Sequence, residues 1–135
     1  MYSNILVPVA MEENEDFRAP LAVARALASE GAAITLLHVF EQPPAYALHY
    51  VPADLMKATR DGIVSALEAA VADLPGGRAV VIDGAPGRSI SDWAARHGVD
   101  LIVMASHRPG MGDVIWGSTA AHVVRHVACA VHVLR

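Results

Sequence analysis

Residues Asp100 to Gly112, DLIVMASHRPGMG, decide the fold of this chain together with the Gly117-Ser118-Thr119 segment that follows. The apolar run Leu101–Ala105 predicts a strand buried on both faces, as in parallel sheets. A Gly/Pro-rich loop then leads to a predicted helix that starts at Ser118, ends near Val127 and can be capped by Ser118 or Thr119. The first N–H groups of a helix lack partners and point outward, so this arrangement predicts a phosphate-type anion site. The same pattern also fits an ordinary strand-to-helix connection, and the loop contains neither a P-loop nor a G-x-G-x-x-G fingerprint.

Composition limits the classes of protein to consider. The chain has 135 residues, 54% of them hydrophobic, which predicts one domain over residues 1–135. No segment approaches the ~20 apolar residues of a membrane span, and the N-terminus lacks a basic start and cleavage site, so we expect a cytoplasmic protein. The formal charge of −4, with Lys57 as the only lysine, argues against a nucleic-acid surface. The single cysteine, Cys129, lies in an apolar run and is expected to be a buried small hydrophobe.

Strands and helices are expected to alternate along the whole chain. Asp16 is expected to cap the first helix and Gly31 to end it. The predicted strands cover residues 4–9, 33–40, 78–82, 101–105 and 130–134, and the predicted helices cover 17–29, 53–74, 88–97 and 118–127. This alternation is typical of an α/β fold with a doubly wound, five-stranded parallel sheet, helices on both faces and the expected strand order 3-2-1-4-5.

In that order, the first and fourth strands flank the switch point, where open α/β sheets bind ligands. The crevice would be lined by Pro8, Val9 and Ala10 from the first strand and by Met104, Ala105 and Ser106 from the fourth, with Gly117-Ser118 facing it.

A long segment, residues 41–52, follows the second strand and contains three prolines. Loops of this length are often functional, which makes the segment a candidate lid. Tyr46 and Tyr50 could cover a ligand or pack on the neighbouring helix, and we favour packing.

Five pieces of the sequence, in the right order, resemble the universal stress protein family. They are Ile5–Val9, Leu36–Val39, Gly84-Ala85-Pro86, Asp100–His107, and Gly117-Ser118 with Val124–Arg135. The resemblance covers the whole chain. It implies an adenine nucleotide alpha-hydrolase-like fold, and a small cytoplasmic dimer whose C-terminal strand often pairs across the two-fold axis. It also implies that ATP or another adenine nucleotide, with Mg²⁺ as an optional companion, binds through G-x2-G-x9-G-[ST].

This chain departs from that motif. Ala105 stands at the first glycine, Arg108-Pro109 replaces the second, and Gly117 follows Ala105 by twelve positions where the motif has thirteen. Ala10 stands where an Asp commonly contacts the ribose or adenine. The segment Ser106-His107-Arg108-Pro109 nevertheless resembles a compact-loop branch of the family that is also associated with nucleotide binding, and the guanidinium of Arg108 suits phosphate oxygens.

The resemblance assigns the site residues to three parts of a nucleotide. It places Pro8, Val9 and Val39 at the base, Met104 and Ala105 beneath the ribose, and Ser106, Arg108, Gly117, Ser118 and Thr119 at the phosphates. Core packing is the alternative role for Pro8, Val39 and Met104, and helix capping is the alternative role for Ser118.

Catalysis is not expected. No G-x-S-x-G elbow is present, and the adjacent Ser106 and His107 have poor geometry for a nucleophile and its base. His122 and His126 have the spacing of a zinc pair, but no Glu or third ligand accompanies them, so solvated or interface histidines are favoured.

Two functions therefore stay open. One is a nucleotide-binding stress or signalling protein, and the other is a stress protein that binds no nucleotide and acts as a dimeric interaction module. In both, the strand Ala130–Leu134 is expected at an unprotected sheet edge that pairs in a homodimer.

Overall fold

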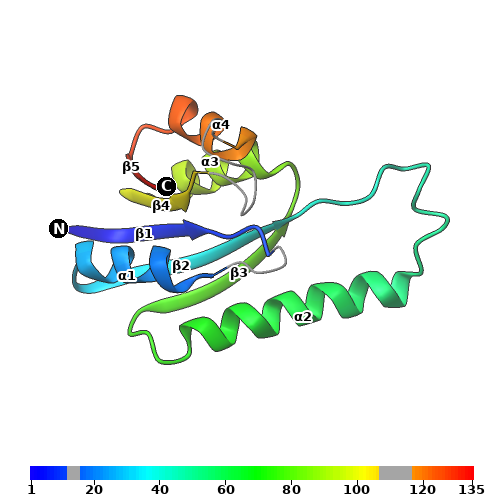
Figure 1. Cartoon of the computed structure of the whole chain (residues 1–135), viewed down its shortest axis with the longest axis horizontal. Helices are drawn as coiled ribbons and strands as arrows, with labels where there is room; N and C mark the ends of the chain where they lie inside the picture. The colour runs from blue at the N-terminus through cyan, green and yellow to red at the C-terminus, as the bar shows by residue number, and fades with distance from the viewer. Residues whose placement is uncertain (12–15, 107–116) are drawn as a thin grey trace.

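The computed structural model describes residues 1–11, 16–106 and 117–135. Strands and helices alternate along the chain (Figure 1). In order they are β1 Tyr2–Pro8, α1 Arg18–Leu27, β2 Ala28–Phe40, α2 Ala53–Val71, β3 Gly77–Asp83, α3 Pro86–Arg96, β4 Leu101–Ala105, α4 Ser118–His126 and β5 Ala130–Leu134.

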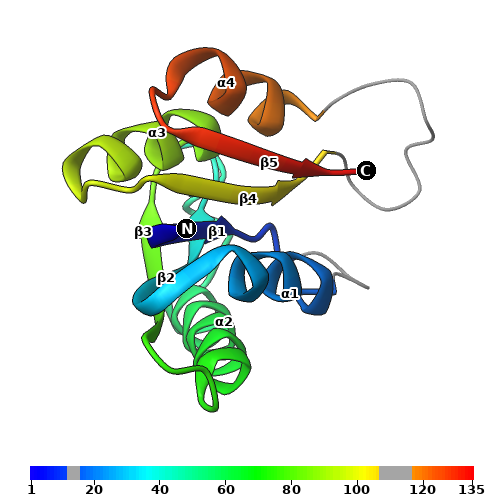
Figure 2. The same cartoon turned by 90° about the vertical axis from the view of Figure 1, so that its left-hand side faces the viewer.

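The five strands form one sheet in the order β3-β2-β1-β4-β5, and every neighbouring pair is parallel. Helices α1 and α2 lie on one face, and α3 and α4 lie on the other (Figures 1 and 2). The predicted fold class and strand order are confirmed. β1 lies at the centre, and the chain leaves it towards β2 on one side before returning to β4 on the other.

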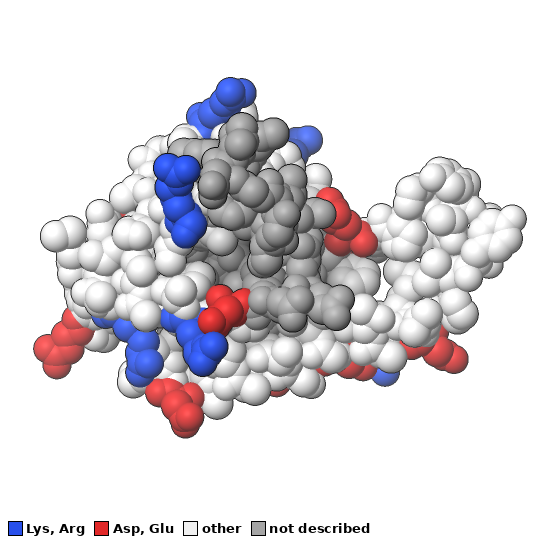
Figure 3. Space-filling view, in the orientation of Figure 1, with Lys and Arg blue, Asp and Glu red and all other residues white. Residues whose placement is uncertain are grey.

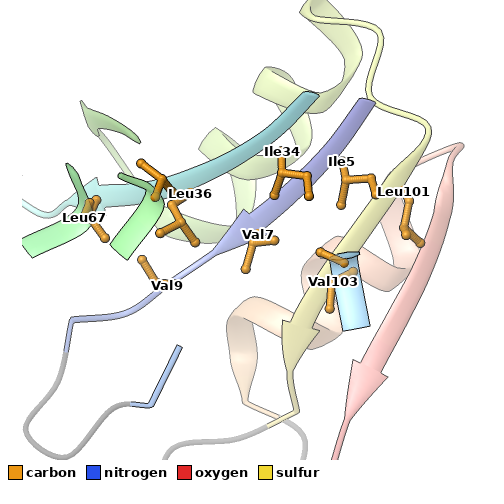
Figure 4. Close-up of a cluster of buried hydrophobic side chains, with 10 residues drawn as sticks. Ile5, Val7, Val9, Ile34, Leu36, Leu67, Leu101 and Val103 are labelled. Carbon is orange, nitrogen blue, oxygen red and sulfur yellow. The ribbon is translucent and has the colours of Figure 1, made fainter. Parts of the chain in front are cut away.

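Both faces of the central strands are buried, as the apolar runs predicted. Side chains of a strand alternate between faces, so Ile5 and Val7 of β1 join the cluster under α1 and α2, while Leu6 joins the cluster under α3 and α4. Figure 4 shows the first cluster, in which Leu67 of α2 lies beside Leu36 of β2. These two hydrophobic layers hold the strand ends that form the candidate site.

The predicted boundary between the first helix and the second strand is wrong. Helix α1 ends at Leu27 rather than Ser29, and β2 starts at Ala28 rather than Ala33. Tyr2 already pairs with Ala28, and the register then shifts so that Asn4 pairs with Ala33. Pairing with β1 overrides the local helical pattern, and Gly31, with φ of 76°, lies within the irregular part of β2 instead of ending the helix.

Other helix ends differ by a few residues. Phe17 precedes α1 and makes no side-chain cap, although the carboxylate of Asp16 accepts a hydrogen bond from the N–H of Arg18. Helix α2 stops at Val71 instead of Leu74 because the chain turns through Gly76, whose φ is 73°. Helix α3 covers Pro86–Arg96 instead of 88–97, since proline is well suited to a first helical turn.

Asp100 joins the starts of β1 and β4. Its carboxylate accepts hydrogen bonds from the backbone N–H groups of Ser3, at 2.9 Å, and Asn4, at 3.0 Å, and from the Ser3 hydroxyl. Burial acts to raise the pKa of this carboxyl group, but these hydrogen bonds outweigh burial and hold the pKa of Asp100 below its ordinary value. The ionised side chain therefore holds β1 beside β4 near the amino ends of these strands, at the opposite end of the sheet from the candidate site.

Residues 41–52 and the first turns of α2 form an arm that extends away from the sheet (Figures 1 and 3). Turns stabilise it locally, with the N–H of Ala47 bonded to the carbonyl of Pro44 at 2.8 Å. Tyr46 and Tyr50 are 79% and 86% exposed, so the favoured prediction that they pack on the neighbouring helix is wrong. The reason is geometric, because the first turns of α2 extend beyond the sheet and the two rings do not pack there.

Candidate functional site

The candidate site lies at the carboxyl ends of β1 and β4. Paired residues between these strands are Ile5 with Leu101 and Leu6 with Ile102, so the described register stops before either strand ends. Beyond it, β1 leads to Ala10 and β4 leads to Ala105, both of which are exposed. The switch point predicted from the sequence is therefore present, with small side chains on each side of it.

Ser106 joins three elements at this point. Its N–H donates to the carbonyl of Leu134 at 2.8 Å, and its own carbonyl accepts from the N–H of Gly117 at 2.7 Å. The residue is only 3% exposed. These two bonds hold the first residue before α4 against the end of β4, so the helix start faces the same edge of the sheet as the β1 and β4 ends.

The start of α4 differs from the prediction in one detail. Gly117 occupies the cap position, and no side-chain hydrogen bond caps the helix there, so capping by Ser118 or Thr119 is wrong. Ser118 is instead the first helical residue and is exposed, and Thr119 is half-buried. Helix geometry leaves the N–H groups of this first turn without acceptors inside the helix. An anion placed here would also meet the positive end of the helix dipole.

Three of the predicted site residues are core residues in this structure. Val9, Val39 and Met104 are 7%, 6% and 4% exposed. Val9 packs under α1 and α2, whereas Val39 and Met104 pack in the cluster under α3 and α4. The structure thus places Val9 and Val39 in different hydrophobic layers. Pro8, at the end of β1, is half-buried.

The sequence reasoning assigned no role to His38, a buried polar residue beside the site. The imidazole Nδ1–H of His38 donates to the carbonyl oxygen of Val9 at 2.9 Å, and the residue is 8% exposed. This bond and the Val9 N–H bond to Leu37, also 2.9 Å, fix the backbone where β1 ends. The signal for this role was a histidine inside a mostly apolar, buried run of β2.

A second feature of this edge was also not predicted. An open depression of about 710 Å³ is lined by Glu41, Gln42, Asp83, Gly84 and Ala85, at the ends of β2 and β3. Arg60 of α2 forms an ion pair with Asp83, and its guanidinium lies 5.9 Å from the centre of the Phe40 ring. Among the predicted site residues that the structure describes, none lines this depression, which lies at the carboxyl ends of β2 and β3.

Other sequence-based assignments have different outcomes. Arg108, together with His107 and Pro109, lies outside the described residues. Cys129 is half-buried against the α3 and α4 cluster, and burial raises the pKa of its thiol, which agrees with its predicted role as a small hydrophobe.

Within residues 1–11, 16–106 and 117–135, no three His, Cys, Asp or Glu side chains gather to hold a metal ion. Helices long and apolar enough to cross a bilayer are also absent from these ranges.

Together these features define a doubly wound α/β protein. A helix start and two strand ends meet at its topological switch point, the place where open α/β sheets bind ligands. A family model described as "Universal stress protein family" matches residues 1–135, and the chain belongs to that family.

Two relatives align with this chain over nearly its whole length. Universal stress protein G of Escherichia coli O157:H7 is 27% identical over 142 aligned positions, which cover 100% of each chain. The structure of universal stress protein UspA from Lactobacillus plantarum is 28% identical, with a TM-score of 0.72 over 99% of this chain and 98% of that one.

More distant structures share the fold and were solved with ligands. They are a universal stress protein in complex with cAMP, one from Archaeoglobus fulgidus with dAMP and one from Arabidopsis thaliana with AMP. Their identities to this chain are 15–19% and their TM-scores 0.63–0.68, over 98–99% of this chain and 90–98% of theirs.

Proposed function

We propose that this protein binds an adenine nucleotide at the switch point and acts in a stress response or in signalling through that binding, rather than as a dedicated catalyst. The observation that carries the proposal is the 2.7 Å bond from the Gly117 N–H to the Ser106 carbonyl. It holds the first turn of α4 beside the ends of β4 and β1, where helix N–H groups can receive phosphate oxygens. The adenine nucleotides bound to structural neighbours support the same ligand class.

The roles of the residues follow from their exposure. Ala10, Ala105 and Ser118 are exposed at the site and are proposed to touch the ligand. Val9, Val39 and Met104 are proposed to form the rigid layers behind it. We also assign Arg108, from the Ser106-His107-Arg108-Pro109 segment, as the positively charged side chain that binds the phosphate oxygens. ATP with Mg²⁺ is the specific ligand proposed, and the cytoplasm is the proposed location.

Ala105→Glu tests the location of the site. The substitution adds a negative charge at the end of β4, and we expect it to weaken nucleotide binding at least about tenfold, equivalent to 1.4 kcal/mol. Calorimetric titration of the nucleotide-stripped protein with AMP and with ATP, each with and without Mg²⁺, measures the effect. Ala95→Glu is the matched control, because Ala95 is exposed near the end of α3, towards the opposite edge of the sheet. Equal affinities of the two variants, or no binding by the unaltered protein at millimolar nucleotide, would contradict the proposal.

A homodimer is proposed as well, and it also serves the alternative function as an interaction module. β5 is an edge strand of the described sheet, and Ala130 and His132 on it are exposed. Neither lysine nor proline blocks this edge. We expect light scattering to give twice the mass of one chain, 14.2 kDa. A single-chain mass at the concentrations used for nucleotide titration would remove the dimer from both functions.

A further inference from the structure

The arm carries most of the large hydrophobic side chains that are exposed in the described part of the chain. Six such side chains are exposed, and four of them lie within residues 46–55. These four are Tyr46, Leu48, Tyr50 and Leu55. The other two, Met1 and Val124, lie at the N-terminus and on α4. Exposed apolar side chains that gather on one segment are typical of a site of interaction.

Local bonds shape the arm before any partner arrives. The N–H of Tyr50 donates to the carbonyl of Ala47 at 3.0 Å, and the N–H of Met56 donates to the carbonyl of Pro52 at 3.2 Å. The three prolines within residues 41–52 each hold the backbone φ at about −65°. A surface that is ordered in advance loses less conformational entropy on binding, so the arm is suited to recognition.

The apolar part of the arm is uncharged and has acidic residues at both ends. Residues 43–53 contain no Lys, Arg, Asp or Glu, and Glu41 and Asp54 flank them. Both flanking side chains are exposed, and neither forms an ion pair within the described residues. In Figure 3 the outer part of the arm is white, with acidic side chains at its borders. The charge that would complement this surface is positive.

Glu41 also lines the open depression at the carboxyl ends of β2 and β3. Asp83 lines the same depression, but Arg60 already neutralises it. A positively charged side chain that enters the depression at the base of the arm would therefore meet the carboxylate of Glu41. Hydrogen bonds between such charged groups are the strong ones.

These charges favour one kind of occupant over three others. A symmetric contact with a second copy would bring the acidic ends of two identical arms together, and like charges at an interface are unfavourable. Nucleic acids and anionic membranes attract basic segments, whereas residues 41–56 contain no Lys or Arg. A different protein with basic residues beside an apolar face has none of these difficulties.

We propose that the arm is a docking surface for another protein, and that it binds a segment whose apolar face is bordered by Lys or Arg side chains. Tyr46 and Tyr50 are the anchors, because tyrosine is enriched among the residues that dominate binding at interfaces. Glu41 and Asp54 pair with the basic border of the partner. This surface is separate from the proposed nucleotide site and does not depend on it.

The probe for the test is a labelled amphipathic helical peptide of about 18 residues, five turns, built from Leu and Lys. Its charge-reversed counterpart contains Leu and Glu. Fluorescence anisotropy at physiological ionic strength should show saturable binding of the Leu/Lys peptide to the full chain and none of the Leu/Glu peptide. Asp54→Lys, and Tyr46→Ser combined with Tyr50→Ser, should each weaken binding at least about tenfold.

Two matched variants control for nonspecific effects. Val124→Ser removes an exposed apolar side chain from α4, and Asp73→Lys makes the same charge change just beyond the other end of α2. Both should bind the Leu/Lys peptide as the unaltered protein does. Both tyrosines are exposed, so the double tyrosine variant should unfold at the unaltered temperature. Hydrogen–deuterium exchange should slow within residues 43–56 when the peptide is added.

Several outcomes would overturn the proposal. They are equal affinities of the double tyrosine variant and Val124→Ser, equal binding of the Leu/Glu peptide, and slowed exchange only outside residues 43–56. A lower mass of the double tyrosine variant in light scattering would instead identify a second copy as the occupant. Binding to phosphatidylserine vesicles that the double variant loses would identify a membrane. Nucleotide binding is tested separately by Ala105→Glu, so either proposal can fail alone.

Discussion

Leu67→Ala should lower the free energy of unfolding by about 3 kcal/mol, within the usual range for a buried leucine in a well-packed core. Leu67 lies on the second half of α2, is fully buried, and packs in the cluster between α2 and the sheet (Figure 4). Removing its methyl groups leaves a cavity, because strands β1 and β2 cannot move in to fill it. Urea unfolding, followed by circular dichroism, measures the loss.

Leu55→Ala is the control for this prediction. It removes the same atoms from the same helix, but Leu55 is 58% exposed on the arm. Such a surface change usually stays within about 0.5 kcal/mol. The difference between the two variants measures how strongly each half of α2 is attached to the sheet. Equal losses would mean that the arm packs against the molecule in solution, contrary to the structure.

Gly76→Ala is the second large effect, and we expect it to cost about 3 kcal/mol. Gly76 has φ of 73°, a conformation that costs a residue with a Cβ about 1–2 kcal/mol. The added Cβ would also collide with the carbonyl oxygen of Ala32, and overpacking of this kind adds about 1–3 kcal/mol. The collision occurs where the Gly76 carbonyl accepts the N–H of Ile34 at 3.0 Å, so the start of β3 must move away from β2.

Gly62→Ala should have the opposite sign. Gly62 lies inside α2, and a Cβ added there meets nothing within 4 Å. Alanine restricts the unfolded chain and favours the helix, which should raise the free energy of unfolding by about 0.4–1 kcal/mol. Thermal and urea unfolding of the two glycine variants, measured side by side, check the signs. A stabilised Gly76→Ala protein would show that the turn between α2 and β3 differs from the one described.

The arrangement of strands was predictable because it depends on patterns that are local in sequence. Leu101–Ala105 is apolar without interruption, and only a strand covered on both faces can bury such a run. The alternation of such strands with helices then leaves few possible topologies, since connections between parallel strands usually pass through a helix. The same local reasoning placed Ala105, Ser106 and Gly117 at one edge of the sheet, and the structure brings them together there.

Details that depend on contacts between distant segments were not predictable. Local composition supports a helix through Ser29, yet pairing with β1 makes Ala28 the start of β2, because hydrogen bonds to a neighbouring strand outweigh weak helix propensity. Exposure of Tyr46 and Tyr50 was missed for a related reason, since only the three-dimensional path of α2 shows that its first turns extend beyond the sheet.

By itself, the sequence determined the class of fold and the strand order, because hydrophobic periodicity and glycine-containing turns act over short stretches. It also predicted the end of the sheet at which we propose a ligand site. Tertiary structure alone decided which residues of that edge are accessible. It buried Val9 and Val39 in opposite layers, exposed Ala10 and Ala105, and bonded His38 to the Val9 carbonyl. Accessibility depends on which segments pack together, and those segments lie far apart in the chain.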